Sequence, residues 1–202
     1  MIKEIVNVNG YWVNSINALC EDIRIEATTK NRVSASLLHL SLEHFAAIHI
    51  LLSKQHYGSA YSLLRPQFES YIRGVWFSFI ATDLELDKFI QKDELKPTFG
   101  KLISDLENLE LYQNRELSDI KKKIWGSLCS YTHGGAYQLA FRNKTNAIEL
   151  DFSEKELIQF LFLSNELALL SLVNLAQIGN RPDISLQASI KHNELFNRYK
   201  NL

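Results

Sequence analysis

Helix-breaking residues are scarce in this chain, and that scarcity is the strongest constraint on its fold. Its 202 residues include three prolines and eight glycines, so long stretches contain neither. Within these stretches apolar residues recur at the three- or four-residue spacing of one helix face. We therefore predict an all-α fold, a helical bundle of roughly five to seven helices in which short connections favour antiparallel neighbours.

The expected helices are bounded by capping and turn residues. Long helices are predicted over residues 9–28, 34–57, 59–81, 114–133 and 153–178, shorter ones over residues 84–91 and 98–109, and a last one over residues 184–199. In this prediction Gly58 ends the second helix. Ser153 opens a later one with a capping box, because Glu156 lies three residues on. Residues 146–152 alternate enough to indicate a strand, without an obvious partner.

The composition predicts a single domain, and the net charge excludes a strong overall electrostatic attraction for a charged partner. Hydrophobic residues make up 46% of the chain, which is ample for a core. We expect a single all-α domain over residues 1–202, with a core at about residues 34–178 and the terminal helices packed on it or extending it. The formal net charge is -1, so any binding to RNA or DNA would need a local basic patch.

Three features predict a cytoplasmic protein outside the membrane. Cys20 and Cys129 are too few and too far apart to indicate a disulfide framework or a metal site. The first residues lack the pattern of a secretory signal. Residues 157–179 form the longest apolar stretch, and its polar residues include the carboxylate of Glu166 and the amides of Gln159, Asn165 and Asn174. A buried helix of a soluble protein explains that stretch better than a membrane span.

Two charged residues fall within or beside the apolar face of the helix expected at residues 59–81. On a helical wheel, that face consists of Leu64, Phe68, Ile72, Val75, Trp76 and Phe79. With Tyr61 at zero, Arg65 falls at about 40°, Glu69 at about 80° and Arg73 at about 120°. Burying a charge costs several kcal/mol unless it is paired and hydrogen-bonded. An inward-facing pair four residues apart therefore needs an explanation.

Two interpretations of Arg65 and Glu69 stay open. Either they form a structural ion pair with the arginine stem packed on Trp76, or they line a cavity for an anionic or polar ligand. Pro66 bears on both, because it removes a backbone donor and would bend the helix near Ser62 unless the helix begins there. Such a bend can open a pocket, but prolines also bend helices without functional consequence.

His133 lies at the end of a helix and outside its apolar stripe, which consists of Leu117, Ile120, Ile124, Leu128 and Tyr131. It shares the opposite side with Lys122, Gly126 and Cys129. Because mid-helix glycine costs about 0.5–1 kcal/mol, Gly126 predicts that another backbone approaches closely there. Two interpretations of His133 stay open. It is either a helix-capping residue followed by Gly134, or an acid/base or phosphate contact presented to a partner helix or a second subunit.

Other local signatures of chemistry are weak. His39 and Glu43 have the i, i+4 spacing of helical metal ligands, but His44 and His49 turn away by about 140° each. Surface histidines explain this pattern better, so we expect no metal and no cofactor. The sequence contains no Gly-rich phosphate loop, nucleophile elbow, CxxC pair or dinucleotide fingerprint.

Two stretches together resemble a known group of proteins: SLEHFAAIHILLSKQHYGSAYSLLRPQFESYIRGVWFSF (residues 41–79) and IWGSLCSYTHGG (residues 124–135). They resemble a family of uncharacterised bacterial all-α proteins that is distantly similar to the HEPN superfamily (higher eukaryotes and prokaryotes nucleotide-binding). The resemblance covers roughly residues 34–178. Its motifs are Leu-Arg-x-x-x-Glu and Tyr-x-His-Gly, here at Leu64, Arg65 and Glu69 and at Tyr131, His133 and Gly134.

The resemblance implies a HEPN-like bundle that forms a homodimer in a toxin–antitoxin or other antiviral defence system. Its partners would be RNA or a nucleotide, and an antitoxin or other protein. Many HEPN proteins are metal-independent ribonucleases that bring an arginine and a histidine together at the dimer interface. By this resemblance the catalytic residues would be His133, Arg65 and Glu69, and the substrate-binding residues would be Arg73, Tyr131 and Lys122.

One departure from the family pattern matters for this activity. The nuclease members carry the arginine a few residues before the histidine, where this chain has Ser127, Leu128 and Cys129. Either Arg65 or Arg73 substitutes from another helix, or the protein is not a nuclease. Two functions are therefore predicted as alternatives. One is a metal-independent ribonuclease of a defence or toxin system, and the other is a non-enzymatic module that binds a nucleotide, RNA or a protein.

Overall fold

The computed structural model describes residues 1–144 and 146–199, and it confirms the all-α helical bundle. Its long helices are α1 (Ile2–Glu21), α2 (Thr29–Ser53), α3 (Tyr57–Phe79), α6 (Glu116–Thr132), α8 (Glu154–Ile178) and α9 (Pro182–Phe196). Its shorter elements are α4 (Asp83–Lys92), α5 (Phe99–Leu106), α7 (Ala136–Ala140) and the 3-10 turns η1 (Glu110–Tyr112) and η2 (Asn197–Tyr199). The described residues thus hold nine α-helices, more than the predicted five to seven, and α7 is the one without a counterpart among the predicted ranges.

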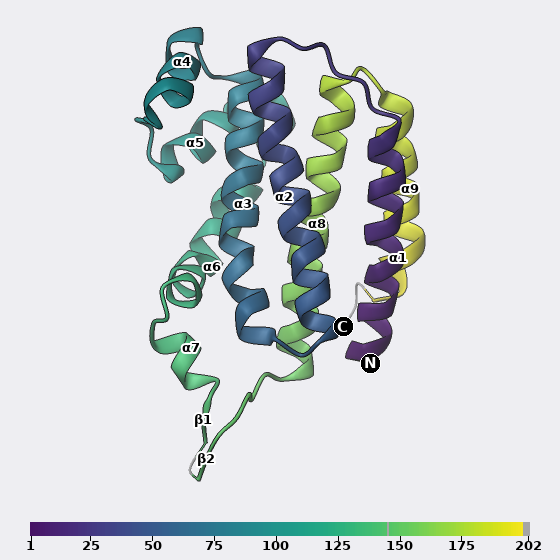
Figure 1. Ribbon diagram of the computed structural model, residues 1–202, viewed down its shortest axis with the longest axis vertical. Helices are drawn as coiled ribbons and strands as arrows, with labels where there is room; N and C mark the ends of the chain where they lie inside the picture. The colour runs from purple at the N-terminus through teal and green to yellow at the C-terminus, as the bar shows by residue number, and fades with distance from the viewer. Residues whose placement is uncertain (145, 200–202) are drawn as a thin grey trace.

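The long helices stand side by side, and α3 is the one that carries the candidate site (Figure 1). It packs against α2, α8, α6 and α5. At the other side of the bundle α1 packs against α2, α8 and α9. Because α3 contacts four other helices, its side chains meet the bundle core on one side and α6 on another.

The predicted apolar face of α3 is buried except at its end. Phe79 is 39% exposed, whereas the other members are at most 3% exposed: Leu64, Phe68, Ile72, Val75 and Trp76. α3 also buries Gln67, whose amide donates to the Ser164 carbonyl at 2.8 Å and accepts from the Ser164 hydroxyl at 2.7 Å. This reciprocal pairing satisfies the buried polar groups where α3 meets α8.

The first helix differs from its prediction at both ends. The sequence pattern predicts residues 9–28, but α1 begins at Ile2 and ends at Glu21. Its buried stripe starts at Ile5 and continues through Trp12, so the apolar period extends back to the N-terminus. Thr28 belongs to the next helix instead, because its hydroxyl accepts the backbone N–H of Asn31 at 3.1 Å and caps α2.

Gly58 does not end α2, contrary to the prediction. α2 ends at Ser53, and Gln55, with a φ of 60°, turns the chain in the left-handed region. Gly58 lies in the first turn of α3, where the side chains of Arg142 and Gln138 approach its α-carbon closely. A larger residue at this position would require the ends of these two flexible side chains to move.

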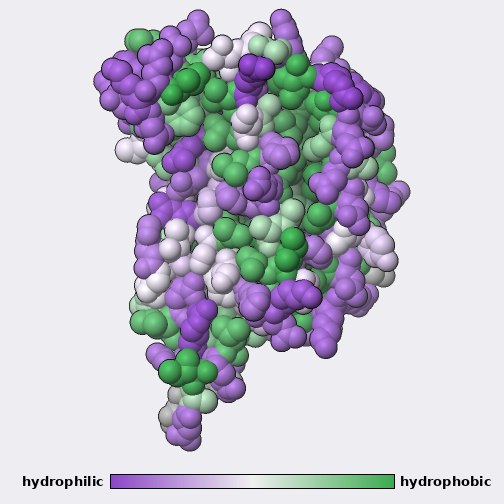
Figure 2. Space-filling view, viewed as in Figure 1, coloured by the Kyte–Doolittle hydropathy of each residue, from purple (hydrophilic) through white to green (hydrophobic). Residues whose placement is uncertain are grey.

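A short hairpin replaces the strand predicted at residues 146–152. β1 (Asn143–Lys144) pairs antiparallel with β2 (Ala147–Ile148), which supplies the missing partner. The rest of the predicted strand is not in a sheet. The hairpin projects below the bundle (Figure 1), and Figure 2 shows hydrophobic surface on this projecting part. Ile148 is 84% exposed and Leu139, in α7, is 56% exposed.

Two helices, α2 and α8, are long and apolar enough to span a membrane by length and composition alone. The core helices of soluble bundles share these properties. In α8 the amides of Asn165 and Asn174 are buried within the bundle, whereas Gln159 and Glu166 are exposed. Cytoplasmic location and the absence of a membrane partner remain predictions from the sequence.

Two helix-interior glycines have opposite surroundings. A Cβ built on Gly74, in α3, would lie 2.9 Å from Leu38 Cγ and 3.1 Å from the Leu38 backbone nitrogen. Gly74 therefore permits the close approach of α2 and α3. A Cβ on Gly126, in α6, would meet nothing within 4 Å. The prediction of a backbone packed against Gly126 is therefore wrong, because that face of α6 is open.

These two positions give a matched test of the α2–α3 packing. We expect Gly126→Ala to raise the free energy of unfolding by about 0.5–1 kcal/mol, because alanine favours the helix and meets no obstacle. Gly74→Ala gains the same helix propensity but must displace Leu38, so we expect it to be about 1–3 kcal/mol less stable than Gly126→Ala. Urea denaturation measures both values, and an equal gain at both positions would contradict the close approach.

Candidate functional site

Three charged side chains follow one another along α3. Arg65 Nε donates to Glu69 Oε1 at 2.8 Å, and Arg73 Nη2 lies 3.1 Å from Glu69 Oε2. The side chains of Arg65 and Glu69 are only 22% and 17% exposed, and that of Arg73 is 38% exposed. The ion pair predicted from the helical wheel is therefore present. It is half-buried at the edge of the core rather than inside it.

The end of α6 explains why a glycine pair follows His133. His133 is the C-cap, and Gly134 follows it with a φ of 66°, in the left-handed region that glycine adopts at little cost. The N–H of Gly135 then donates to the Ser130 carbonyl at 2.7 Å. This is the hydrogen bond of a Schellman motif, which ends the helix and holds the exposed His133 at its last turn.

Arg65 and His133 meet across the two helices. Arg65 Nη1 lies 2.9 Å from His133 Nε2. A guanidinium can only donate, so the contact requires a neutral imidazole that accepts at Nε2 and carries its proton on Nδ1. The structure thus brings together the three residues predicted to be catalytic, with Glu69 and His133 on different atoms of the same guanidinium.

The guanidinium of Arg65 also lies over an aromatic ring, but not the predicted one. Its Cζ is 4.8 Å from the ring centroid of Trp125, on α6. Trp76 instead donates from Nε1 to Asp105 at 3.3 Å. Phe99 stacks on Trp125 at 4.5 Å between centroids, which fixes the tryptophan ring, and a cation over that ring is attracted by its π-face.

The turn of α3 before Pro66 contacts the end of α6. α3 begins at Tyr57 and continues through Pro66, so proline lies inside the helix and its missing N–H leaves the Ser62 carbonyl without a helical donor. The hydroxyl of Thr132 donates to the Leu128 carbonyl of its own helix at 2.9 Å and lies 3.5 Å from the Ser62 carbonyl, while Ser62 Oγ lies 3.0 Å from the Tyr131 carbonyl. These contacts join α3 to the residues directly before His133.

Two of the predicted substrate-binding residues lie apart from this cluster. Tyr131 is 5% exposed, and its ring packs on Tyr61 at 4.7 Å and lines a pocket between α6 and α8. Burial raises its pKa, and the nearby carboxylate of Glu156 adds to the increase. Lys122 is exposed on α6, eleven residues before His133, which is about 16 Å along the helix axis. Lys121 is the lysine near the cluster, with Nζ 6.0 Å from the Trp125 ring centroid.

The cluster carries an excess of positive charge. Arg65 and Arg73 both pair with the carboxylate of Glu69, and Lys121 lies near the Trp125 ring over which Arg65 is placed. Guanidinium groups recognise phosphates and carboxylates through several fixed N–H donors. Two guanidiniums that share one carboxylate leave a local excess of positive charge, although the chain's formal net charge is -1.

Two histidines of α2, His44 and His49, are half-buried. Across residues 1–144 and 146–199, no group of three or more His, Cys, Asp or Glu side chains could hold a metal ion. Burial lowers the pKa of His44, with an opposing effect from Glu43, and burial also lowers the pKa of His49. The ring of His49 lies against Gly10 of α1, where an added Cβ would be 3.3 Å away. His49 is therefore a packing residue between two helices.

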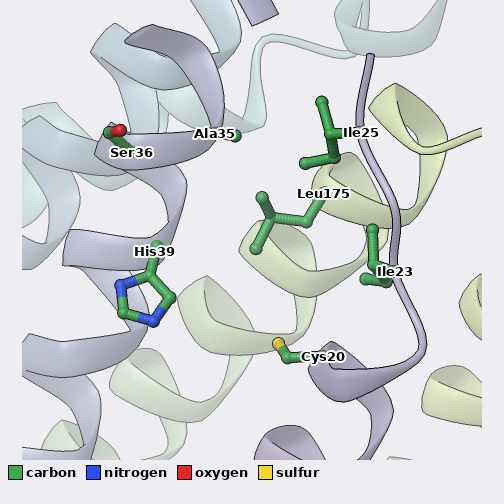
Figure 3. A pocket seen from close by; sticks show the side chains of 7 residues that line it. All are labelled: Cys20, Ile23, Ile25, Ala35, Ser36, His39 and Leu175. Carbon is green, nitrogen blue, oxygen red and sulfur yellow. The ribbon is translucent and has the colours of Figure 1, made fainter. Parts of the chain in front are cut away.

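A second hollow lies where the end of α1 faces α2 and α8. It has a volume of about 370 Å³ and is lined mainly by aliphatic side chains, with Leu175 at its floor and Ile23 and Ile25 at one side (Figure 3). Cys20 and His39 line it from separate helices. Burial raises the pKa of the Cys20 thiol to about 11, so it is protonated at neutral pH and is a poor nucleophile.

Comparison with known proteins gives one match. A model described as "Family of unknown function (DUF6988)" matches residues 38–200, a range that includes the whole cluster from Arg65 to His133. No match is found among curated proteins or among solved structures.

The half-buried ion pairs of Glu69 predict a measurable loss of stability. We expect Glu69→Ala to lower the free energy of unfolding by about 1–2 kcal/mol, because it leaves two guanidiniums beside each other without their carboxylate. Glu194→Ala is the control, since Glu194 is 61% exposed and 3.8 Å from Lys191, and its loss should stay below about 0.5 kcal/mol. Similar losses in both variants, measured by urea denaturation, would show that Glu69 is solvated like Glu194.

The lowered pKa of His49 predicts an acid-dependent loss of stability. An unfolded histidine titrates near pH 6.5, so below that pH the unfolded chain takes up a proton that folded His49 does not. This histidine's contribution is therefore present above about pH 6.5 and is lost as the pH falls towards the lower folded pKa.

The test compares the wild type with His49→Gln between pH 7.5 and pH 5. We expect the stability advantage of the wild type to shrink as the pH falls, because the variant has no imidazole to protonate. His39→Gln, which removes an exposed imidazole from the same helix, should retain that dependence. A difference between the wild type and His49→Gln that stays constant with pH would contradict the burial of His49.

Proposed function

The chain belongs to this family of unknown function, DUF6988, and we propose from its side-chain geometry that it binds a phosphate group of RNA or of a nucleotide. The binding site is the cluster of Arg65, Glu69, Arg73 and His133. The observation that carries the proposal is the contact of Arg65 Nη1 with His133 Nε2 at 2.9 Å, which joins two phosphate-binding side chains from different helices.

Free donors on both arginines support phosphate binding. Within the part of the chain that the structure describes, Arg65 Nη2 and Arg73 Nη1 have no hydrogen-bond partner. Glu69 binds Arg65 through Nε and Arg73 through Nη2. The free N–H groups of the two arginines are therefore already oriented before a ligand arrives. Preorganised donors lose less side-chain entropy on binding.

The overall charge is compatible with a site that recognises one or two phosphates, rather than with an extended surface that binds many phosphates of a nucleic acid. With a formal net charge of -1, long-range attraction for RNA is weak. Each phosphate neutralised on a single strand contributes a slope of about -0.7 to the dependence of log affinity on log salt. Two arginines therefore correspond to modest, salt-sensitive binding.

Metal-independent RNA cleavage is the second candidate, and the contact of His133 Nε2 with a guanidinium, which can only donate, favours it. If the substrate phosphate takes the place of His133 on Arg65, the freed Nε2 lone pair can accept the proton of a ribose 2′-OH. The 2′ oxygen then bonds to phosphorus while the bond from phosphorus to the 5′ oxygen breaks. The protonated His133 returns its proton to that leaving oxygen, which yields a 2′,3′-cyclic phosphate and a free 5′-OH. Arg65, on α3, then takes the place of the arginine that HEPN nucleases carry beside the histidine.

Fluorescence anisotropy with a labelled single-stranded RNA tests binding. We expect Arg73→Gln to weaken binding about tenfold at low salt, as loss of one charge-assisted contact predicts. The salt slope should fall by about 0.7 in magnitude, because one phosphate contact is lost. Lys122→Gln removes the same charge from an exposed position outside the cluster and should change affinity less than about twofold. Equal effects of the two variants, or no binding by the wild type, would refute the proposal.

Product analysis of the same RNA, with EDTA present, tests cleavage. The expected products end in a 2′,3′-cyclic phosphate and a 5′-OH. His133→Gln should abolish their formation and weaken RNA binding by no more than about tenfold, as loss of one of several phosphate contacts predicts. Cleavage that persists unchanged in His133→Gln would rule out the enzymatic candidate. Binding without cleavage in the wild type would leave phosphate recognition as the function.

A further inference from the structure

A pocket rich in aromatic side chains lies between α6, α7 and α8, with α3 at its floor. Its volume is about 290 Å³, and five aromatic residues line it: Tyr61, Tyr131, Tyr137, Phe141 and Phe160. The polar residues at its wall are Ser127, Glu156 and Gln159. The lining does not include Arg65 or His133, so this pocket is separate from the anion-binding cluster.

Tyr61 and Phe160 stack on each other, at 17° and 4.0 Å between centroids, and form one wall of the space. The other lining rings do not form a slot with this wall. Tyr61 and Tyr131 are tilted by 41°, and Tyr131 and Tyr137 by 40°. Tyr131 and Phe141 are closer to parallel, at 23°, but their centroids are 6.2 Å apart. A flat ring between two others needs about 7 Å, twice a carbon–carbon contact distance of about 3.5 Å. The geometry favours a compact group enclosed by ring faces over a stacked nucleobase.

The pocket has negative electrostatic character. Aromatic faces carry partial negative charge, and the carboxylate of Glu156 adds a full charge at the wall. Burial raises the pKa of Tyr61 and of Tyr131, Glu156 adds to both increases, and the nearby Arg142 opposes the increase at Tyr131. Among the described side chains, those that line the pocket include no lysine or arginine.

Helix capping holds Glu156 in place. Its Oε2 accepts the backbone N–H of Ser153 at 2.9 Å and the Ser153 hydroxyl at 2.6 Å in the capping box of α8. The phenol of Tyr61 donates to the Glu156 backbone carbonyl at 3.0 Å. The carboxylate and one wall of aromatic rings are thus fixed relative to each other before any ligand binds.

We propose that this pocket binds an organic cation, an alkylated ammonium group enclosed by the tyrosine and phenylalanine faces with its charge opposite Glu156. Ring faces attract quaternary and alkylated ammonium groups, and desolvation by the surrounding rings strengthens that attraction. A fixed carboxylate at the wall adds a Coulomb attraction that a neutral ligand of the same shape does not gain.

An NMR titration with choline and its uncharged carbon isostere, 3,3-dimethylbutan-1-ol, tests the proposal. The two probes have the same shape, so their difference isolates the charge. We expect choline to bind saturably and at least tenfold more tightly than the isostere. Glu156→Gln should weaken choline binding at least threefold while keeping the capping box, because glutamine also caps at that position. Tyr137→Leu should weaken it similarly, and Tyr137 is 52% exposed, so this variant tests the pocket without unfolding the core.

Tyr11→Leu is the matched control, because Tyr11 is 66% exposed on α1 and does not line the pocket. It should bind choline like the wild type. Equal affinity for the two probes would show a merely apolar pocket and would overturn the proposal. Tighter binding of adenosine than of choline would identify a nucleobase site and would also overturn it. Absence of choline binding would refute it directly, and none of these outcomes depends on the cluster around Arg65.

Discussion

The guanidinium of Arg65 holds the candidate site together, because it contacts groups on two helices at once. Along α3 it binds the carboxylate of Glu69, and across the helix interface it meets the imidazole of His133 and the ring of Trp125. Each contact uses a different part of a planar, permanently charged group, which a lysine could not reproduce. The orientation of the end of α6 and the chemistry of the site therefore depend on the same side chain.

The surrounding structure keeps these groups at the surface while fixing their positions. Pro66 leaves the Ser62 carbonyl without a helical donor, Ser62 Oγ lies 3.0 Å from the Tyr131 carbonyl, and the Schellman motif ends α6 at His133. The turn of α3 before Pro66 thus contacts the end of α6. The site is partly shielded from water but still reachable from solvent. These properties suit a site that recognises a small anionic group, whereas a purely structural ion pair does not need to be reachable.

Sequence reasoning succeeded where the signal is local. The i, i+4 pair of Arg65 and Glu69, the capping box of Ser153 and the glycine-terminated helix end at His133 all depend on neighbours along the chain. It failed where the partner comes from another element. A helical wheel gives the direction of a side chain within its own helix, but it does not identify what lies across from it. Trp125 and Lys121 near Arg65, the contact of Gly74 with Leu38, and the open space at Gly126 became visible only with the tertiary structure.

The central claim is that Arg65, Arg73 and His133 recognise a phosphate together. The most direct measurement is a nitrogen–proton NMR titration of protein labelled with ¹⁵N-histidine and ¹⁵N-arginine, using a short single-stranded RNA as the probe. The chain has six histidines, which serve as internal controls for one another. The account predicts saturable shifts of the His133 ring nitrogens and of the Arg65 and Arg73 Nε signals, at one common affinity, while the other histidines do not move. Shifts spread over all the histidines, or a silent His133, would contradict it.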